Sequence, residues 1–173
     1  TLIRHVNRLI EPTSGEIIFE GKDILRCSPD ELRAIRREKM SMVFQNFGLL
    51  PHRTVIENAG LALEARGISR KEKTSIAEKW LDEVGLQGSS DKYPNQLSGG
   101  MRQRVGIARA LASNAEVMLM DEAFSALDPL IRTDMQDLLL RLQKELCKTI
   151  IFITHDLDEA LKIADHLVIL KEG

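Results

Sequence analysis

Cysteines, aromatic residues and long apolar runs are all scarce in this chain of 173 residues. The two cysteines, Cys27 and Cys147, stand far apart and outside any CxxC or Cys/His cluster. This excludes a disulfide framework and a cysteine-based zinc site, and it fits a reducing cytosol. No apolar run approaches the ~20 residues that a membrane-spanning helix needs. With 4% aromatic, 43% hydrophobic and 29% charged residues, the composition excludes disorder and collagen and is typical of one ordinary globular core.

An excess of positive charge is also absent. Lys and Arg number 24 against 26 Asp and Glu, so the formal net charge is -2. Nucleic-acid binding and polybasic membrane binding normally need a clear basic excess. The charge balance therefore speaks against both classes, and any partner has to be inferred from particular sites.

The first half of the chain predicts short, mixed elements. The apolar spacing predicts a helix over Leu2 to Ile10, and Glu16 to Glu20 has strand composition. Ser28-Pro29-Asp30-Glu31 supplies an N-cap, a proline at the first helical position and a capping-box acid. Further elements are expected as a strand at 40–44, a loop at 46–53 and amphipathic helices at 55–66 and 69–84.

The second half predicts an open parallel sheet. Apolar runs at 117–120, 150–153 and 167–170 have the composition of buried strands. Helices are expected between them, one from the Asp128-Pro129 cap to about Leu146 and one that Asp156 and Glu159 cap. Strands that alternate with helices indicate an α/β fold with right-handed crossovers.

Polar side chains follow two of these apolar runs. Asp121 and Glu122 end one run, and His155 follows another. Ligands bind at the carboxyl ends of strands in such sheets, where one carboxylate can hold Mg²⁺ and a second can polarise an attacking water. Acidic residues also commonly end strands as simple turn caps, and for this pair alone the two interpretations have about equal weight.

A glycine pair adds weight to the first interpretation. Leu97-Ser98-Gly99-Gly100-Met101 precedes a helical stretch from Arg102 to Ala112. Backbone N–H groups at a helix start bind anions, and Ser98 adds a hydroxyl donor. A lone Ser-Gly-Gly is more often a flexible turn, but here it stands a short distance before the Asp-Glu pair.

Taken together, LSGGMRQRVGIARAL and VMLMDEAFSALDP resemble the signature motif, Walker B strand and D-loop of ATP-binding cassette (ABC) ATPases. VFQNFGLLPH is similar to the Q-loop region of that family, and IIFITHDLDEAL to its switch-histidine region. The order of the motifs agrees throughout the chain. The phrase DEAFSALDPLIRTDMQ looks most like the ATPase subunits of glycine betaine/proline (quaternary amine) importers.

The resemblance implies a P-loop NTPase (RecA-like) parallel-sheet core with an inserted α-helical signature subdomain and a short antiparallel β segment. Residues 1–173 would form one nucleotide-binding domain fragment, with 1–45 and 113–173 as the catalytic α/β core and 46–112 as the helical subdomain. ATP and Mg²⁺ are the implied cofactors.

The resemblance also assigns roles. Asp121 would be a magnesium ligand, Gln45 would contact magnesium and the attacking water, and Glu122 would be the general base. His155 would contact the γ-phosphate, and Asp128 would communicate across a dimer. The nucleotide-binding residues are expected to be Thr1, Ser98, Gly99, Gly100, Gln103 and Asp128. Taken singly, each of three residues also has a purely structural interpretation. Gln45 would be a solvated loop residue, His155 a hydrogen-bond partner at a strand end and Asp128 a helix cap.

One part of the family pattern is missing from the given sequence, namely the phosphate-cradling loop G-x-x-x-x-G-K-[ST]. Thr1 aligns with the residue that follows this motif. We therefore expect an N-terminally truncated chain that binds ATP poorly alone, in which Leu2 to Ile10 is the remainder of the helix after the loop.

The implied function is that of an ATPase subunit of an importer, and two alternatives compete with it. In the leading hypothesis two copies sandwich ATP and drive an integral membrane permease at the cytoplasmic face of the inner membrane, with a solute-binding protein involved indirectly and no nucleic acid. Residues 46–58 would contact the permease. The alternatives are a non-transport ABC ATPase in DNA repair or translation, and a catalytically inactive fragment. Only 53 positions separate Gln45 from Ser98, too few for the long coiled coils of the repair proteins.

Overall fold

The protein is described by a computed structural model in which residues 2–146 and 148–171 are placed. It is an α/β fold with a parallel sheet and a separate antiparallel hairpin. In chain order the elements are α1 (Ile3–Val6), β1 (Ile18–Phe19), β2 (Lys22–Asp23), the 3₁₀ helix η1 (Ile24–Arg26), α2 (Pro29–Glu38), β3 (Met40–Val43), α3 (Val55–Ala59), α4 (Leu61–Ala65), α5 (Arg70–Glu83), the 3₁₀ helix η2 (Pro94–Gln96), α6 (Gly99–Ala112), β4 (Val117–Asp121), α7 (Pro129–Leu146), β5 (Thr149–Ile153) and α8 (Leu157–Ile163).

The parallel sheet has the order β3-β4-β5. Val43 is in register with Met120, and Asp121 with Ile153, so the three strands end at the same edge. The predicted apolar strands at 40–44, 117–120 and 150–153 are confirmed within a residue or two. A polar residue that the sequence singled out follows the end of each strand within two residues: Gln45 after β3, Glu122 after β4 and His155 after β5.

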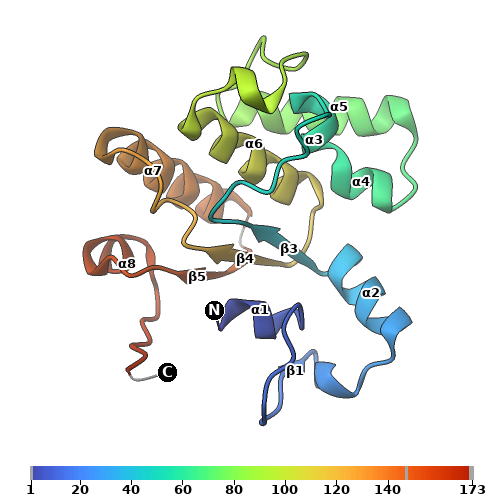
Figure 1. Cartoon of the computed structure of the whole chain (residues 1–173), viewed down its shortest axis with the longest axis vertical. Coiled ribbons are helices and arrows are strands. Elements are labelled where there is room, and N and C mark those ends of the chain that lie inside the picture. Colours follow the sequence, from blue (N-terminus) through green and yellow to red (C-terminus); the bar gives the residue numbers. More distant parts are fainter. Residues whose placement is uncertain (1, 147, 172–173) are drawn as a thin grey trace.

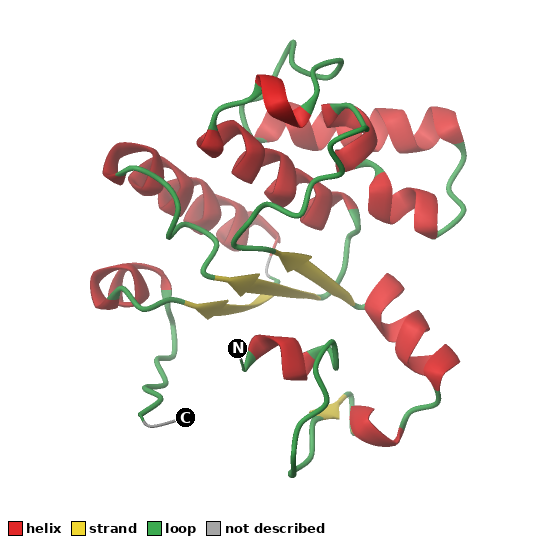
Figure 2. Ribbon diagram, in the orientation of Figure 1, coloured by secondary structure: helices red, strands yellow, loops and turns green. Residues whose placement is uncertain are grey.

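Helices cover one face of the sheet. Figures 1 and 2 show α6 and α7 directly above the strands, with α3, α4 and α5 stacked beyond α6. One hydrophobic cluster runs through both layers, because Val43 and Met120 from the sheet join Ile107 of α6 and Met135 of α7. Phe124, in the loop after β4, is fully buried in this cluster and lies 5.5 Å from the ring of Phe152. The loop that follows the Asp-Glu pair is therefore anchored in the core.

Side-chain caps fix the helix starts as predicted. Ser28 and Glu31 form a reciprocal capping box at α2, and Asp156 accepts from the Glu159 amide at α8. At α5, Ser69 accepts from the Glu72 amide, which is half of the expected capping box. The helix expected over 55–66 is divided at Gly60 into α3 and α4.

Two sequence-based predictions were wrong. The run Leu167 to Leu170 is not a strand, since it pairs with none of the described strands and its side chains are largely exposed. An apolar run satisfies its backbone as a strand only beside a partner, and Figure 1 shows this segment leading away from the sheet. The helix expected over Leu2 to Ile10 is shorter, because it ends at Val6 and Arg8 takes a left-handed backbone (φ 54°).

A surface ion network in the helical layer should make stability depend on acid. Glu64 of α4 binds Arg53 (2.9 Å) and Lys73 (2.6 Å), and these contacts lower the pKa of its carboxyl from 4.5 to about 2. A depressed folded pKa contributes stability above the ordinary value and loses it as the pH falls toward the folded value. Glu64→Gln should therefore reduce the acid sensitivity between about pH 4.5 and 2, with a small effect because the network is exposed. Urea titrations across this range measure it, and an unchanged pH dependence would contradict the coupling.

Candidate active site

Three side chains from the ends of the three parallel strands meet at one carboxylate oxygen. Gln45 follows β3, Glu122 follows β4 and His155 follows β5. Glu122 Oε2 accepts a hydrogen bond from Gln45 Nε2 at 3.1 Å and lies 3.2 Å from His155 Nδ1. Gln45 Nε2 also lies 3.4 Å from the Ser125 hydroxyl oxygen. The parallel register brings Gln45 and His155 to Glu122, although they lie 77 and 33 positions from it in the sequence.

The backbone at Glu122 aims its side chain at this edge. Its φ of 46° lies in the left-handed region, which non-glycine residues occupy at a cost of about 1 kcal/mol or more. The Glu122 amide donates to the Ile153 carbonyl oxygen at 2.9 Å, so the turn is tied to the end of β5. The side chain is one-quarter exposed. A strained, tethered carboxylate at a strand end is typical of a group placed for chemistry.

Asp121 is almost fully buried and pairs with a cation. Its Oδ2 accepts from Arg4 Nε at 3.1 Å, which ties α1 to the end of β4. Sequence reasoning missed Arg4, since a pair separated by 117 positions leaves no local signal. Arg4 supplies positive charge where the family resemblance places a metal ion.

The Ser98-Gly99-Gly100 turn begins α6. Ser98 is the N-cap and its hydroxyl accepts from the Met101 amide at 3.3 Å. A Cβ at Gly100 would lie 2.6 Å from Ile131 Cγ2 of α7, so glycine is required there for packing. A Cβ at Gly99 would meet only Phe47 Cζ at 3.9 Å, an ordinary contact. Packing against α7 therefore requires a glycine at position 100, whereas the space around Gly99 at the start of α6 is not filled.

The remaining site predictions occupy different environments. Asp128 caps α7, because its Oδ1 accepts from the Ile131 amide at 3.2 Å, and its side chain is exposed. Gln103 is fully buried in α6, and in the described part of the chain its side-chain amide has no hydrogen-bond partner. Thr1 lies outside the described residues. The nucleotide-binding roles of these three residues stay predictions.

Buried Arg109 fixes the segment that follows Gln45. Its guanidinium, on α6, donates to the carbonyl oxygens of Phe47 (3.1 Å) and Gly48, and it stacks 5.9 Å from the Phe44 ring centroid. Burial lowers the pKa of this guanidinium. Arg102 lies over the Phe47 ring at 5.1 Å. One helix therefore carries the Ser98 turn at its start and holds the Gln45 loop further along.

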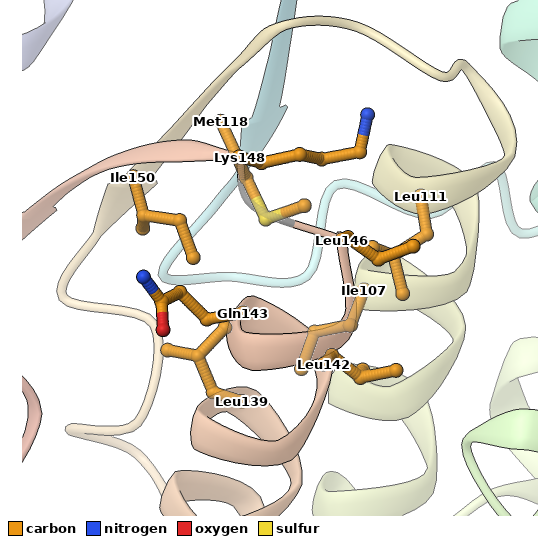
Figure 3. A pocket seen from close by; sticks show the side chains of 9 residues that line it. All are labelled: Ile107, Leu111, Met118, Leu139, Leu142, Gln143, Leu146, Lys148 and Ile150. Atoms are coloured by element: carbon orange, nitrogen blue, oxygen red, sulfur yellow. The ribbon is translucent and has the colours of Figure 1, made fainter.

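The candidate site is open to solvent, since the side chain of His155 is 71% exposed and that of Glu122 is 26% exposed. Figure 3 shows a small gap between α6, α7, β4 and β5, lined by apolar side chains such as Ile107, Met118 and Leu142. It is a packing gap in the core. The polar cluster is instead an open strand edge, which fits a ligand that a second surface must cover.

Known proteins with the same sequence pattern are numerous. The ABC transporter family model matches residues 1–125. Over all 173 residues the chain is 59% identical to a glycine betaine/carnitine transport ATP-binding protein of Listeria monocytogenes, 58% to a glycine betaine transport ATP-binding protein of Bacillus subtilis and 54% to a glycine betaine/proline betaine transport system ATP-binding protein of Escherichia coli. It spans 44%, 41% and 43% of their lengths, less than half of each.

Solved structures agree. A dimeric ATP-binding cassette in a post-hydrolysis state, bound to ADP and Pi, superposes with a TM-score of 0.83 at 36% identity, over 93% of this chain and 71% of that one. By sequence and by fold, the chain belongs to the ABC transporter family.

Proposed function

We propose that the protein carrying this chain hydrolyses ATP to drive an importer for glycine betaine or related quaternary amines. The observation that carries the proposal is the meeting of Gln45 and His155 on one oxygen of Glu122, at the edge where three parallel strands end. Relatives that are 54% to 59% identical to the chain are named as ATP-binding proteins of glycine betaine transport. A non-transport role in DNA repair or translation is not favoured.

In this proposal Glu122 is the general base. Its Oε2 accepts the proton of a water that attacks the γ-phosphate, while the hydrogen bond from Gln45 and the close approach of His155 hold the carboxylate in place. His155, whose side chain is 71% exposed, is free to turn one ring nitrogen toward a phosphate oxygen. The site would thus act by positioning, as is usual in phosphoryl transfer.

The donor set fits a magnesium nucleotide better than a free metal ion. Among residues 2–146 and 148–171, no group of three His, Cys, Asp or Glu could hold a metal ion. Mg²⁺ is usually held by one or two carboxylates together with substrate phosphates, and Asp121 with the amide oxygen of Gln45 suits that role. When bound there, the ion would offset phosphate charge.

The open site suggests two kinds of partner, a second copy of this chain and a membrane permease. A second copy would present its Ser98-Gly99-Gly100 turn to the nucleotide, and Asp128 would contact the partner across the interface. We assign residues 1–45 and 113–173 to the catalytic core and 46–112 to a helical subdomain that contacts a membrane permease. In the described part of the chain no helix is long and apolar enough to cross a bilayer. We infer that the ATPase binds peripherally at the cytoplasmic face, with a solute-binding protein acting only through the permease.

The first test concerns the phosphate-cradling loop. We expect the chain as given to bind ATP weakly and to hydrolyse it slowly, because it contains no Gly-Lys-Ser/Thr cradle for the β- and γ-phosphates. A version extended at its N-terminus by such a loop should show Mg²⁺-dependent turnover. Steady-state phosphate release and equilibrium ATP binding measure both properties.

The comparison has two informative failures. Equal, substantial turnover by both versions would contradict the predicted impairment of the chain. No turnover by the extended version, even when reconstituted with permease and binding protein, would contradict the ATPase assignment. Stimulation of that reconstituted system by glycine betaine, but not by an unrelated amino acid, tests the substrate class.

A further inference from the structure

Arg132, in the first turn of α7, joins two of the loops that form the candidate site. Its Nη1 donates to Asp156 Oδ2 at 3.1 Å, directly after His155. Its Nη2 donates to the Leu127 carbonyl oxygen at 3.2 Å, directly before Asp128. One guanidinium therefore binds the loop after β4 and the turn after β5 at the same time.

A second, deeper bridge joins the same two helices. Gln136, one turn after Arg132 on α7, donates from Nε2 to Glu159 Oε1 of α8 at 3.1 Å, and both side chains are buried. Two residues on one face of α7, Arg132 and Gln136, therefore bind two residues at the start of α8, Asp156 and Glu159. The buried Gln136–Glu159 hydrogen bond anchors α8. The Arg132–Asp156 ion pair, in which the Arg132 side chain is 29% exposed, involves the residue next to His155 in the sequence.

His155 needs such support because burial does not hold it. Its side chain is 71% exposed, yet it lies 3.2 Å from Glu122. Asp156 already caps α8 through Oδ1, and its amide donates to the Thr154 hydroxyl at 3.0 Å. The local turn therefore fixes its own shape, while Arg132 fixes where that turn lies relative to Leu127 and the loop of Glu122.

We infer that Arg132 is a positioning residue that holds His155 against Glu122 and links this contact to the Leu127-Asp128 backbone. This inference rests on the proposed ATPase function. A dimer partner that moves Asp128 would move the Leu127 carbonyl, and through Arg132 the turn that carries His155. The second nucleotide site could in this way adjust the first.

The experiment compares Arg132→Gln with Arg141→Gln in the extended, ATP-hydrolysing protein. Arg141 lies on the same helix and also makes ion pairs, with Glu83 (3.4 Å) and Glu145 (3.9 Å). Both partners lie on helices and outside the loops of the candidate site, so Arg141 serves as a control. We expect Arg132→Gln to lower kcat about tenfold with little change in KM for ATP, since misplacement of a catalytic group acts mainly on the chemical step. Arg141→Gln should leave both parameters unchanged. Arg132→Lys should restore part of kcat, because one ammonium can replace only one of the two contacts.

A double variant separates positioning from general stability. If Arg132 acts through His155, adding Arg132→Gln to His155→Ala costs no further activity, since the two changes share one effect. Additive losses, or an equal loss from Arg141→Gln, would overturn the inference.

A readout without ATP keeps this inference distinct from the proposed function. In the chain as given, Arg132→Gln should shift the ring ¹⁵N resonances of His155 toward those of a free imidazole, and Arg141→Gln should not. Unshifted His155 resonances would refute the Arg132 role whether or not the protein hydrolyses ATP. Shifted resonances in a protein without turnover would contradict only the proposed function.

Discussion

Replacing Glu122 by glutamine is expected to abolish most ATP turnover while leaving ATP binding intact. The amide keeps the shape of the side chain and can still accept from Gln45 Nε2, which lies 3.1 Å from Oε2. It cannot accept a proton from water, and loss of a general base typically costs about 100-fold or more in rate. In the extended protein, ATP-bound dimers should accumulate because nothing resets them. Phosphate release and size-exclusion chromatography with ATP measure the two effects.

Glu116→Gln is a matched control for this experiment. Glu116 immediately precedes β4, at the end opposite to Glu122, and forms an exposed ion pair with Lys39. We expect its replacement to leave turnover unchanged. Turnover by Glu122→Gln within a few-fold of the parent protein would remove Glu122 from the role of base and with it the central step of the proposed function.

Replacing Asn58 by alanine should be among the most destabilising single changes in the chain. Asn58 of α3 is fully buried and makes four hydrogen bonds to the loop after Gln45. Its Oδ1 accepts from the Leu50 amide at 2.7 Å, and its Nδ2 donates to the carbonyl oxygens of Leu50 (3.1 Å), Arg53 (3.0 Å) and Thr54 (3.0 Å). The Leu50 and Thr54 carbonyl oxygens also accept from backbone amides, but the Leu50 amide and the Arg53 carbonyl would lose the partner that Asn58 gives them, at a cost of about 3 kcal/mol. Urea denaturation measures the loss.

The isosteric variant Asn58→Asp sharpens this test. A carboxylate there would face three carbonyl oxygens and could satisfy only the Leu50 amide, so the folded state should favour the protonated acid. A raised folded pKa means that the penalty is full at neutral pH and shrinks as the pH falls through that pKa. Asn95→Ala, at an exposed position of η2, is the control and should change stability little. A loss at Asn58 no larger than at Asn95 would contradict the anchoring role.

Local patterns predicted the elements well where their cause is local. The capping box at Ser28, the cap at Asp156 and the three apolar strands depend on residues a few positions apart, and all are present. The run Leu167 to Leu170 failed for the opposite reason. A strand depends on a partner that composition cannot reveal, and no described strand lies beside it.

The candidate site was predicted as a set of positions but not as a set of contacts. The apolar runs predicted that Glu122 and His155 lie at one edge of the sheet, and the family resemblance added Gln45 to them. Arg4 and Arg132, in contrast, serve through partners that are distant in the sequence, and isolated arginines on helices give no signal that distinguishes them from surface charges. The partners of these two arginines can be identified only from the tertiary structure.

Arg109, within α6, donates hydrogen bonds to the carbonyl oxygens of Phe47 and Gly48. The helix can therefore tilt as a rigid body about this arginine. The arm from Arg109 to Ser98 is about 16 Å long, so a tilt of about 10° would swing the serine tip by about 3 Å while the pivot hardly moves. In the proposed ATPase, opening and closing around a nucleotide would then leave Gln45 in place.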